Sequence, residues 1–179
     1  MLQFDGASKR NPGPSALGAV LYDTATGAEI ARIKQYMGPM FTNNQAEYAG
    51  LIAGLTAALE LGYDKIQVRG DSTLIINQVL GVWRVKNEGL MPYHALARKL
   101  RHQFTVFHAR QVPRAQNSVA DALGNEAIAD HVAGTSKDGG WSLEKARKRV
   151  EQVVGDGCDN TRKSGEVVEK KSKKRKTFD

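Results

Sequence analysis

The chain contains a single cysteine, Cys158, and no long run of apolar residues. One cysteine excludes an internal disulfide framework and a four-cysteine zinc site, and it favours a reducing compartment. No stretch approaches the ~20 apolar residues that span a bilayer, and the N-terminus lacks the basic and apolar regions of a signal peptide. We therefore expect a soluble, intracellular protein that has no membrane partner and is, by default, a monomer.

Positive charge is concentrated towards the C-terminus. The net charge is +7, and residues 1–133 hold 13 basic and 11 acidic side chains, whereas residues 134–179 hold 13 and 8. The segment GTSKDGG after Ala133 has the composition of a linker, and few apolar residues follow it. We predict a folded domain over residues 1–133 and a basic, largely disordered tail over residues 134–179, in which Trp141 to Val154 have the composition of a charged helix.

The tail ends in a dense basic run, KKSKKRK, from Lys170 to Lys176. Such a run has three interpretations, which are a solvated tail, a nuclear-import signal and an additional contact with nucleic acid. A net positive charge favours polyanionic partners by long-range attraction, although it does not identify the polyanion.

Apolar periodicity predicts the order of the secondary-structure elements. Strands are expected over residues 2–5, 15–22, 28–36, 65–70 and 104–112, and helices over residues 43–61, 72–80, 92–102 and 117–130. The resulting order is β-β-β-α-β-α-α-β-α. Strands followed by alternating helices and strands predict an α/β fold, with a five-stranded mixed sheet and helices on both of its faces.

Four acidic residues stand where a folded protein normally avoids unpaired charge: Asp5, Glu47, Asp71 and Asp121. Asp5 and Asp71 each end a predicted strand, and Glu47 shares its helix face with apolar residues that point towards the core. A buried carboxylate is costly unless a positive group meets it. Because magnesium takes oxygen ligands and retains water and phosphate in its shell, the pattern predicts a metal-dependent enzyme acting on phosphates.

A simpler interpretation exists for two of these acids. Asp71 is also suited to cap the following helix, and Asp121 is a favourable acid in the first turn of its helix after an Asn117 cap. These roles do not explain Glu47, so we favour the interpretation that accounts for all four.

The segments DGASKRNPG, TNNQAEY, RGDS and NSVADALGNEA carry these acids in this order. They resemble the four motifs of the type 1 ribonuclease H family, which cuts the RNA strand of RNA–DNA hybrids, and the resemblance covers about residues 1–130. It implies a ribonuclease H-like fold in which the acidic quartet binds two Mg²⁺ ions, with Mn²⁺ as an alternative, and cleavage that leaves a 5′-phosphate and a 3′-hydroxyl. Two cations about 4 Å apart can activate water on one side of a phosphorus and stabilise the leaving oxygen on the other.

The resemblance also implies residues that contact the RNA strand. The segment before the catalytic Glu places amides against minor-groove edges and ribose hydroxyls, and here it consists of Thr42, Asn43 and Asn44. Side-chain amides both donate to and accept from the 2′-hydroxyl, which distinguishes RNA from DNA. Beside Asp5, close approach of RNA is expected over the small residues Gly6, Ala7 and Ser8.

For the DNA strand, the resemblance implies a phosphate pocket formed by Thr42 and Asn87, and it places Trp83 where an aromatic ring packs against DNA sugars. Each assignment has an alternative. Thr42 and Asn43 are good N-cap residues for the following helix, which is compatible with substrate binding. Trp83 is alternatively a partly packed surface aromatic, and Asn87 an ordinary loop residue.

The chain departs from the family pattern in two places. Many members carry a histidine in the loop before the last catalytic Asp, and here the loop reads QVPRAQNSVAD. We favour Arg114 as the catalytic cation near the leaving phosphate, and we interpret His108, within an alternating strand, as structural. The short connection over residues 81–90 has no space for a lysine-rich protrusion, so we expect affinity to be lower or to rely on the basic tail. Only four residues precede Asp5, which leaves open whether the first strand is complete.

The leading prediction is therefore an endonuclease specific for RNA–DNA hybrids. Two alternatives remain, which are a catalytically weak hybrid-binding protein and a nuclease of the same fold with another nucleic-acid substrate.

Overall fold

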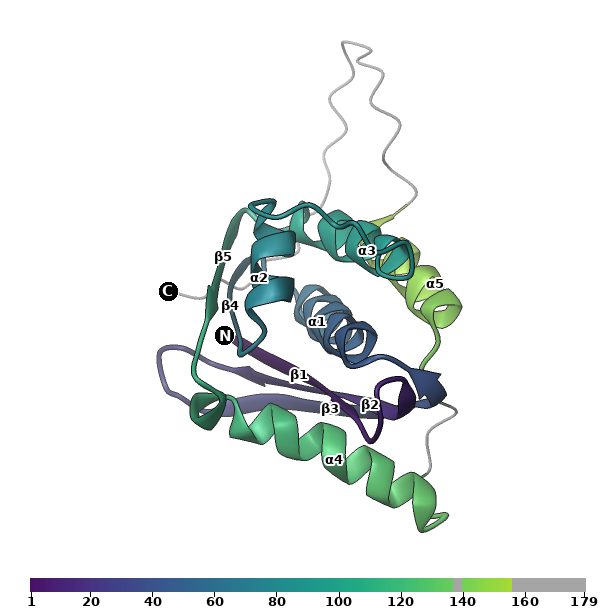
Figure 1. Cartoon of the computed structure of the whole chain (residues 1–179). Helices are drawn as coiled ribbons and strands as arrows, with labels where there is room; N and C mark the ends of the chain where they lie inside the picture. The colour runs from purple at the N-terminus through teal and green to yellow at the C-terminus, as the bar shows by residue number, and fades with distance from the viewer. Residues whose placement is uncertain (137–139, 156–179) are drawn as a thin grey trace.

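The computed structural model describes residues 1–136 and 140–155, in which five strands form one mixed sheet (Figure 1). The order across the sheet is β3-β2-β1-β4-β5. β1, β2 and β3 pair in antiparallel fashion, whereas β1, β4 and β5 are parallel. The bounds are β1 (Leu2–Ser8), β2 (Gly13–Tyr22), β3 (Glu29–Phe41), β4 (Lys65–Gly70) and β5 (Val106–Gln111).

Helices cover both faces of the sheet, as predicted. Figure 1 shows α4 along one face, beneath β1, β2 and β3, and the other helices on the opposite face. In the described ranges no helix is both long and apolar enough to cross a bilayer. The helices are α1 (Asn43–Glu60), α2 (Thr73–Leu80), α3 (Met91–Arg101), α4 (Ser118–Val132) and α5 (Leu143–Val154), with a 3-10 turn, η1 (Arg114–Gln116), before α4.

Helix α1 begins at a capping box. The Thr42 hydroxyl accepts a hydrogen bond from the Gln45 amide, 3.3 Å, and the Gln45 side chain accepts one from the Thr42 amide, 2.9 Å. The helix then packs closely on β1, where a Cβ built on Gly6 would lie only 2.2 Å from the backbone nitrogen of Glu47. Glycine at position 6 therefore allows the contact that places Glu47 beside Asp5.

On the opposite face, a second glycine allows α4 to approach the sheet. A Cβ built on Gly18 of β2 would lie 2.1 Å from the carbonyl oxygen of Ala120. Ala120 itself is fully buried. Because Asp121 follows Ala120, this contact sets the height of the Asp121 backbone above the sheet.

Three strands extend further than expected, and β2 does so by beginning at Gly13 instead of residue 15. β1 continues past Asp5 to Ser8, because Gly6, Ala7 and Ser8 pair with residues 15–17 of β2. β3 continues past residue 36 to Phe41, and a positive φ of 140° at Gly38 accompanies a register shift before Phe41 pairs with Gly13. The prediction that Asp5 ends a strand was therefore wrong, since Asp5 lies within β1.

The folded unit also extends beyond the boundary expected at residue 133. Trp141 and Val150 are buried in the main core, and the Trp141 ring stacks on Tyr93 with 5.8 Å between ring centroids. Arg149 of α5 forms two hydrogen bonds of 2.6 Å with Glu60 of α1. The helix expected within a disordered tail is thus part of the folded protein. Cys158 and the basic run 170–176 lie outside the described residues.

Candidate active site

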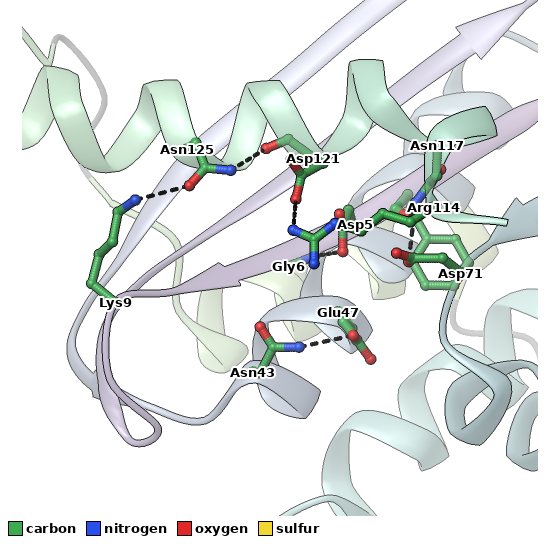
Figure 2. A network of polar contacts seen from close by, with 11 residues as sticks. Asp5, Gly6, Lys9, Asn43, Glu47, Asp71, Arg114, Asn117, Asp121 and Asn125 are labelled. Atoms are coloured by element: carbon green, nitrogen blue, oxygen red, sulfur yellow. Dashed lines mark hydrogen bonds and ion pairs between the residues drawn. The ribbon is translucent and has the colours of Figure 1, made fainter.

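The four predicted acids come together from four different elements. Asp5 lies within β1, Glu47 on α1, Asp71 directly after β4, and Asp121 in the first turn of α4. Figure 2 shows their side chains around the space between α1 and α4. The charges of Asp71, Glu47 and Asp121 all act on the Asp5 carboxyl, as expected for side chains that lie near one another.

Asp5 and Glu47 are buried carboxyl groups, with exposed fractions of 5% and 8%. Burial, together with the charge of Asp71, raises the pKa of Asp5 to about 8, against the opposing effect of a 2.8 Å hydrogen bond from the Gly6 amide. Burial likewise raises the pKa of Glu47 to about 7, while the neighbouring Ser72 and Asn43 side chains act in the opposite direction. In the protein alone, the two carboxylates are therefore unfavourable as anions at neutral pH.

Glu47 has one satisfied and one unsatisfied oxygen. Oε1 accepts a hydrogen bond from the Asn43 side chain, 2.9 Å. Oε2 is buried and makes no hydrogen bond within the described residues. A buried, unpaired carboxylate oxygen costs free energy unless a cation or another donor reaches it.

Asn117 is a site residue that we did not predict from the sequence. It is fully buried, and its side-chain amide donates to the carbonyl of Phe4, 2.8 Å, and to Oδ1 of Asp71, 3.3 Å. The expected N-cap role was wrong for the side chain, which makes no capping hydrogen bond, although the helix does begin after Asn117. The available signal was its spacing of four residues from Asp121, which places both on one side of the helix start.

Arg114 lies beside the acidic cluster, while its role as the catalytic cation stays a prediction. Its Nη2 atom is 2.7 Å from Oδ1 of Asp121, and its side chain is 75% exposed. The hydrogen bond with Asp121 raises the pKa of the guanidinium above its ordinary value. His108, by contrast, is exposed on β5 and lines a shallow cavity with Arg69 and Arg110.

Further polar contacts hold the start of α4. The Asn125 side chain donates to the backbone carbonyl of Asp121, 2.9 Å, and accepts from Lys9, 3.0 Å (Figure 2). Lys9 follows β1, so this chain of contacts connects the loop after β1 to the helix that carries Asp121.

The residues expected beside the RNA strand adjoin the carboxylates. Gly6 and Ala7 are buried, so their small size serves the packing of α1 and α4, and contact of their atoms with RNA remains a prediction. The Ser8 hydroxyl donates to the carbonyl oxygens of Phe41, 3.3 Å, and Arg10. Asn43 and Asn44 occupy the first turn of α1, where only Asn43 contacts the acidic cluster.

The residues expected beside the DNA strand form a separate group. Asn87 is exposed, and its side chain accepts from the Gly89 amide, 2.8 Å, in a local turn. This turn approaches the capping box that contains Thr42, because a Cβ built on Gly89 would lie 3.8 Å from Nε2 of Gln45. Trp83 is 47% exposed on the same connection, away from the carboxylates.

The donor set fits hard divalent cations, although the side chains of the protein alone do not enclose one. Among the residues described, no group of three or more His, Cys, Asp or Glu side chains is arranged so that it could hold a metal ion. Three of the acids instead bond to Asn43, Asn117 and Arg114. Magnesium usually keeps several waters and takes one or two carboxylates together with substrate phosphates, so the unsatisfied oxygen of Glu47 and the unfavourable charge on Asp5 fit such an open site.

Comparison with known proteins identifies the family. Residues 3–127 match the family described as reverse transcriptase-like. Ribonuclease HI of Halobacterium salinarum is 46% identical over 127 residues, which are 71% of this chain and 63% of that protein. A bifunctional protein of Mycobacterium tuberculosis is 41% identical over 128 residues, 72% of this chain and 35% of its own length. The chain therefore spans less than two thirds of either relative.

Solved structures agree with these matches. The crystal structure of RNase H1 from Halobacterium salinarum is 45% identical, with a TM-score of 0.68 over 72% of this chain and 96% of that one. LC11-RNase H1 in complex with an RNA/DNA hybrid is 33% identical, with a TM-score of 0.68, and the match covers 73% of this chain and 97% of that one. Since the match covers nearly all of these solved chains, this chain belongs to the ribonuclease H family and has RNase H1 proteins among its close relatives.

Proposed function

We propose that this chain is an endonuclease that hydrolyses the RNA strand of RNA–DNA hybrids and leaves 5′-phosphate and 3′-hydroxyl ends. The observation that carries the proposal is the burial of Asp5 and Glu47 beside Asp71 and Asp121. A protein gains no stability from such a cluster, because each buried anion raises the cost of the others. The names of the relatives, and the hybrid bound to one of them, support this choice of substrate.

The four carboxylates would hold two Mg²⁺ ions, or Mn²⁺ in their place. Bound cations of this type supply an activated water and stabilise the charge on the leaving oxygen. The chain contributes the oxygen ligands and their support: Asn43 orients Glu47, and Asn117 joins Asp71 to the backbone of β1. Because Asn117 donates to two acceptors at once, it fixes Asp71 relative to the strand that carries Asp5.

Arg114 is proposed to bind the phosphate on the leaving side. Its guanidinium is exposed and bonds to a single oxygen of Asp121, so other donors remain available to a phosphate. An arginine does not give up its proton near neutral pH, which suits it to bind charge rather than to transfer a proton. We propose that Arg114 exchanges between Asp121 and the product phosphate and thereby assists release.

Strand discrimination is proposed to come from the start of α1. Within the described part of the chain the Asn44 side chain makes no hydrogen bond, so its amide can both donate to and accept from a ribose 2′-hydroxyl. Asn43 is proposed to act beside it, with Gly6, Ala7 and Ser8 along the RNA strand. The DNA strand is proposed to contact Thr42 and Asn87 through a phosphate and Trp83 through its sugars.

The test is cleavage of an end-labelled RNA–DNA hybrid beside matched DNA–DNA and RNA–RNA duplexes, each with Mg²⁺ or EDTA. Wild type is compared with Asp71→Asn, which is nearly isosteric, and with Asp130→Asn, a change on α4 at a residue that bonds to Lys34. We expect wild type and Asp130→Asn to cut only the RNA strand of the hybrid, only with metal, and Asp71→Asn to lose turnover by orders of magnitude.

Other outcomes would reject the proposal in different ways. Hybrid binding without metal-dependent cleavage would indicate a binding protein. Cleavage of the DNA duplex at a similar rate would indicate a nuclease with another substrate. Equal turnover by Asp71→Asn would reject the metal-ligand assignment.

A further inference from the structure

A second surface with a distinct chemical character lies away from the carboxylates. This surface, the arginine groove, has a volume of about 1000 Å³ and lies between the end of α2, helix α3 and the start of β5. Figure 1 shows α2 and α3 on the side of the sheet opposite α4, and β5 is the edge strand of that sheet. Its basic lining residues are Arg84, His94, Arg98, Arg101 and His102, and none of its lining residues is acidic.

One of these arginines is held in place by the fold. Nη1 of Arg101 donates to the carbonyl of Val79, 2.7 Å, and the guanidinium lies 5.5 Å from the centroid of the Phe107 ring. Arg84 and Arg98, within residues 1–136 and 140–155, take part in no ion pair and no side-chain hydrogen bond. The groove therefore combines a fixed cation with two that are available to an anionic ligand.

The rim of the groove is apolar as well as basic. Trp83 and Met91 line it and are both exposed, and Val82, next to Trp83 in the chain, is more exposed still. Aromatic side chains beside arginines are the combination that binds single-stranded nucleic acid, where bases stack on the rings and phosphates meet the cations. A duplex covers the faces of its bases, so it offers phosphates to such a surface but nothing to stack on the indole.

Trp83 also connects this groove to the proposed hybrid interface. It lies on the connection between α2 and α3 that carries Asn87, and we assigned both residues to the DNA strand. We infer that the arginine groove binds single-stranded DNA that continues from the DNA strand of the hybrid, so the preferred substrate has an unpaired DNA extension. This inference rests on the proposed function, since it places the hybrid beside Trp83.

The experiment measures binding by fluorescence anisotropy in EDTA, so that the RNA strand stays intact. Four labelled ligands share one hybrid sequence. The first is blunt, the second has a 5′ DNA overhang and the third has a 3′ DNA overhang. The fourth carries the DNA overhang paired with a complementary DNA strand, so that the extension is double-stranded. We expect one overhang polarity to bind about tenfold more tightly than the blunt hybrid, with the duplex extension close to the blunt value.

Two double variants separate the groove from general charge. Arg84→Ala/Arg98→Ala removes two positive charges from the groove, and Arg32→Ala/Arg147→Ala removes two from β3 and α5. We expect the groove variant to lose most of the overhang advantage while it binds and cuts the blunt hybrid like the control variant. The control variant should retain the overhang advantage in full.

Three results would overturn the inference. They are equal binding of blunt and overhang hybrids by wild type, an equal loss in both double variants, and an equal advantage from the double-stranded extension. Cleavage of the blunt hybrid with Mg²⁺ is measured on the same preparations. If wild type cuts this hybrid but binds blunt and overhang hybrids equally, only the inference about the arginine groove is rejected. If wild type cuts no hybrid, the proposed function itself is rejected.

Discussion

The guanidinium of Arg114 and the carboxylate of Asp121 lie 2.7 Å apart at the edge of the acidic cluster, on residues separated by one short turn. The Arg114 side chain is largely exposed, and exposed ion pairs contribute little to stability, typically about 0–1 kcal/mol. The arrangement therefore has more consequence for the charge at the site than for the fold. It holds one positive group near Asp121, Asp5 and Asp71 while most of the guanidinium donors stay free.

Replacement of Arg114 by alanine should lower turnover without unfolding the protein. We expect kcat on the hybrid to fall by roughly 100-fold, the lower end of the range for removed charge-stabilising donors, and Tm to change little. Arg32→Ala is the matched control, because Arg32 also pairs with one carboxylate, Glu29, on the surface. Arg114→Lys should recover only part of the rate, since lysine lacks the planar fork. Unchanged kcat in Arg114→Ala would remove Arg114 from the mechanism.

Asn117→Ala should affect both stability and activity. The substitution leaves the Phe4 carbonyl without its side-chain donor and frees Asp71, and we expect it to cost about 1–3 kcal/mol in the free energy of unfolding. Turnover should fall even below the melting transition, because Asp71 loses its connection to β1. Asn125→Ala, on the same helix, removes a less buried amide that bonds to the Asp121 carbonyl, and it serves as the control. Equal effects of the two changes on kcat would show that Asn117 has no special role at the site.

The stability of the metal-free protein should depend on pH through Asp5. Its pKa is raised to about 8 in the folded protein, first by burial and then by the charge of Asp71, so the folded state holds a proton that the unfolded chain releases near pH 4. The stabilising contribution is present below the ordinary pKa and is lost as pH rises through about 8. Asp5→Asn should therefore raise Tm in EDTA by on the order of 5 °C at pH 8.5 and by less at pH 5.

The control for this experiment is Asp130→Asn, which removes a surface carboxylate paired with Lys34. It should show no gain that grows with pH. A Tm for Asp5→Asn that stays below wild type at pH 8.5 would contradict the burial argument. Addition of Mg²⁺ should stabilise wild type more than Asp5→Asn, because the proposed cation site needs the Asp5 carboxylate.

Local sequence patterns sufficed to predict the order of the elements as far as α4, and they singled out the four acids, whose role as metal ligands stays a prediction. Glu47 was recognisable because it interrupts an otherwise apolar helix face, and Asp71 because it follows an alternating strand. The full lengths of β1 and β3 were not predictable in this way, since they depend on pairing with β2, a contact between distant segments. Asn117 was predicted only as a helix cap, because an asparagine directly before a helix looks the same in the sequence whether its side chain caps the helix or bonds to a distant strand.

The packing of helix α5 on the core was not predictable for a different reason. Its sequence is strongly charged, and only Ala146 and Val150, with Trp141 ahead of the helix, are buried. Two apolar positions four residues apart form one narrow stripe, which composition alone does not distinguish from a solvated segment. The stripe meets α1 and α3, so its burial depends on a surface that is assembled only in the folded domain.

The last prediction concerns this helix and the domain boundary expected at residue 133. A chain ending at residue 155 should be more stable than one ending at residue 136, because the shorter chain exposes the core surface that Trp141 and Val150 cover. In the longer chain, Trp141→Ala should cost about 3–5 kcal/mol and lower Tm by roughly 10 °C, since it removes both the burial and the stacking on Tyr93. Arg147→Ala, on the exposed face of α5, should leave Tm nearly unchanged. Equal Tm values for the chains ending at 136 and 155 would instead support a domain boundary at residue 133.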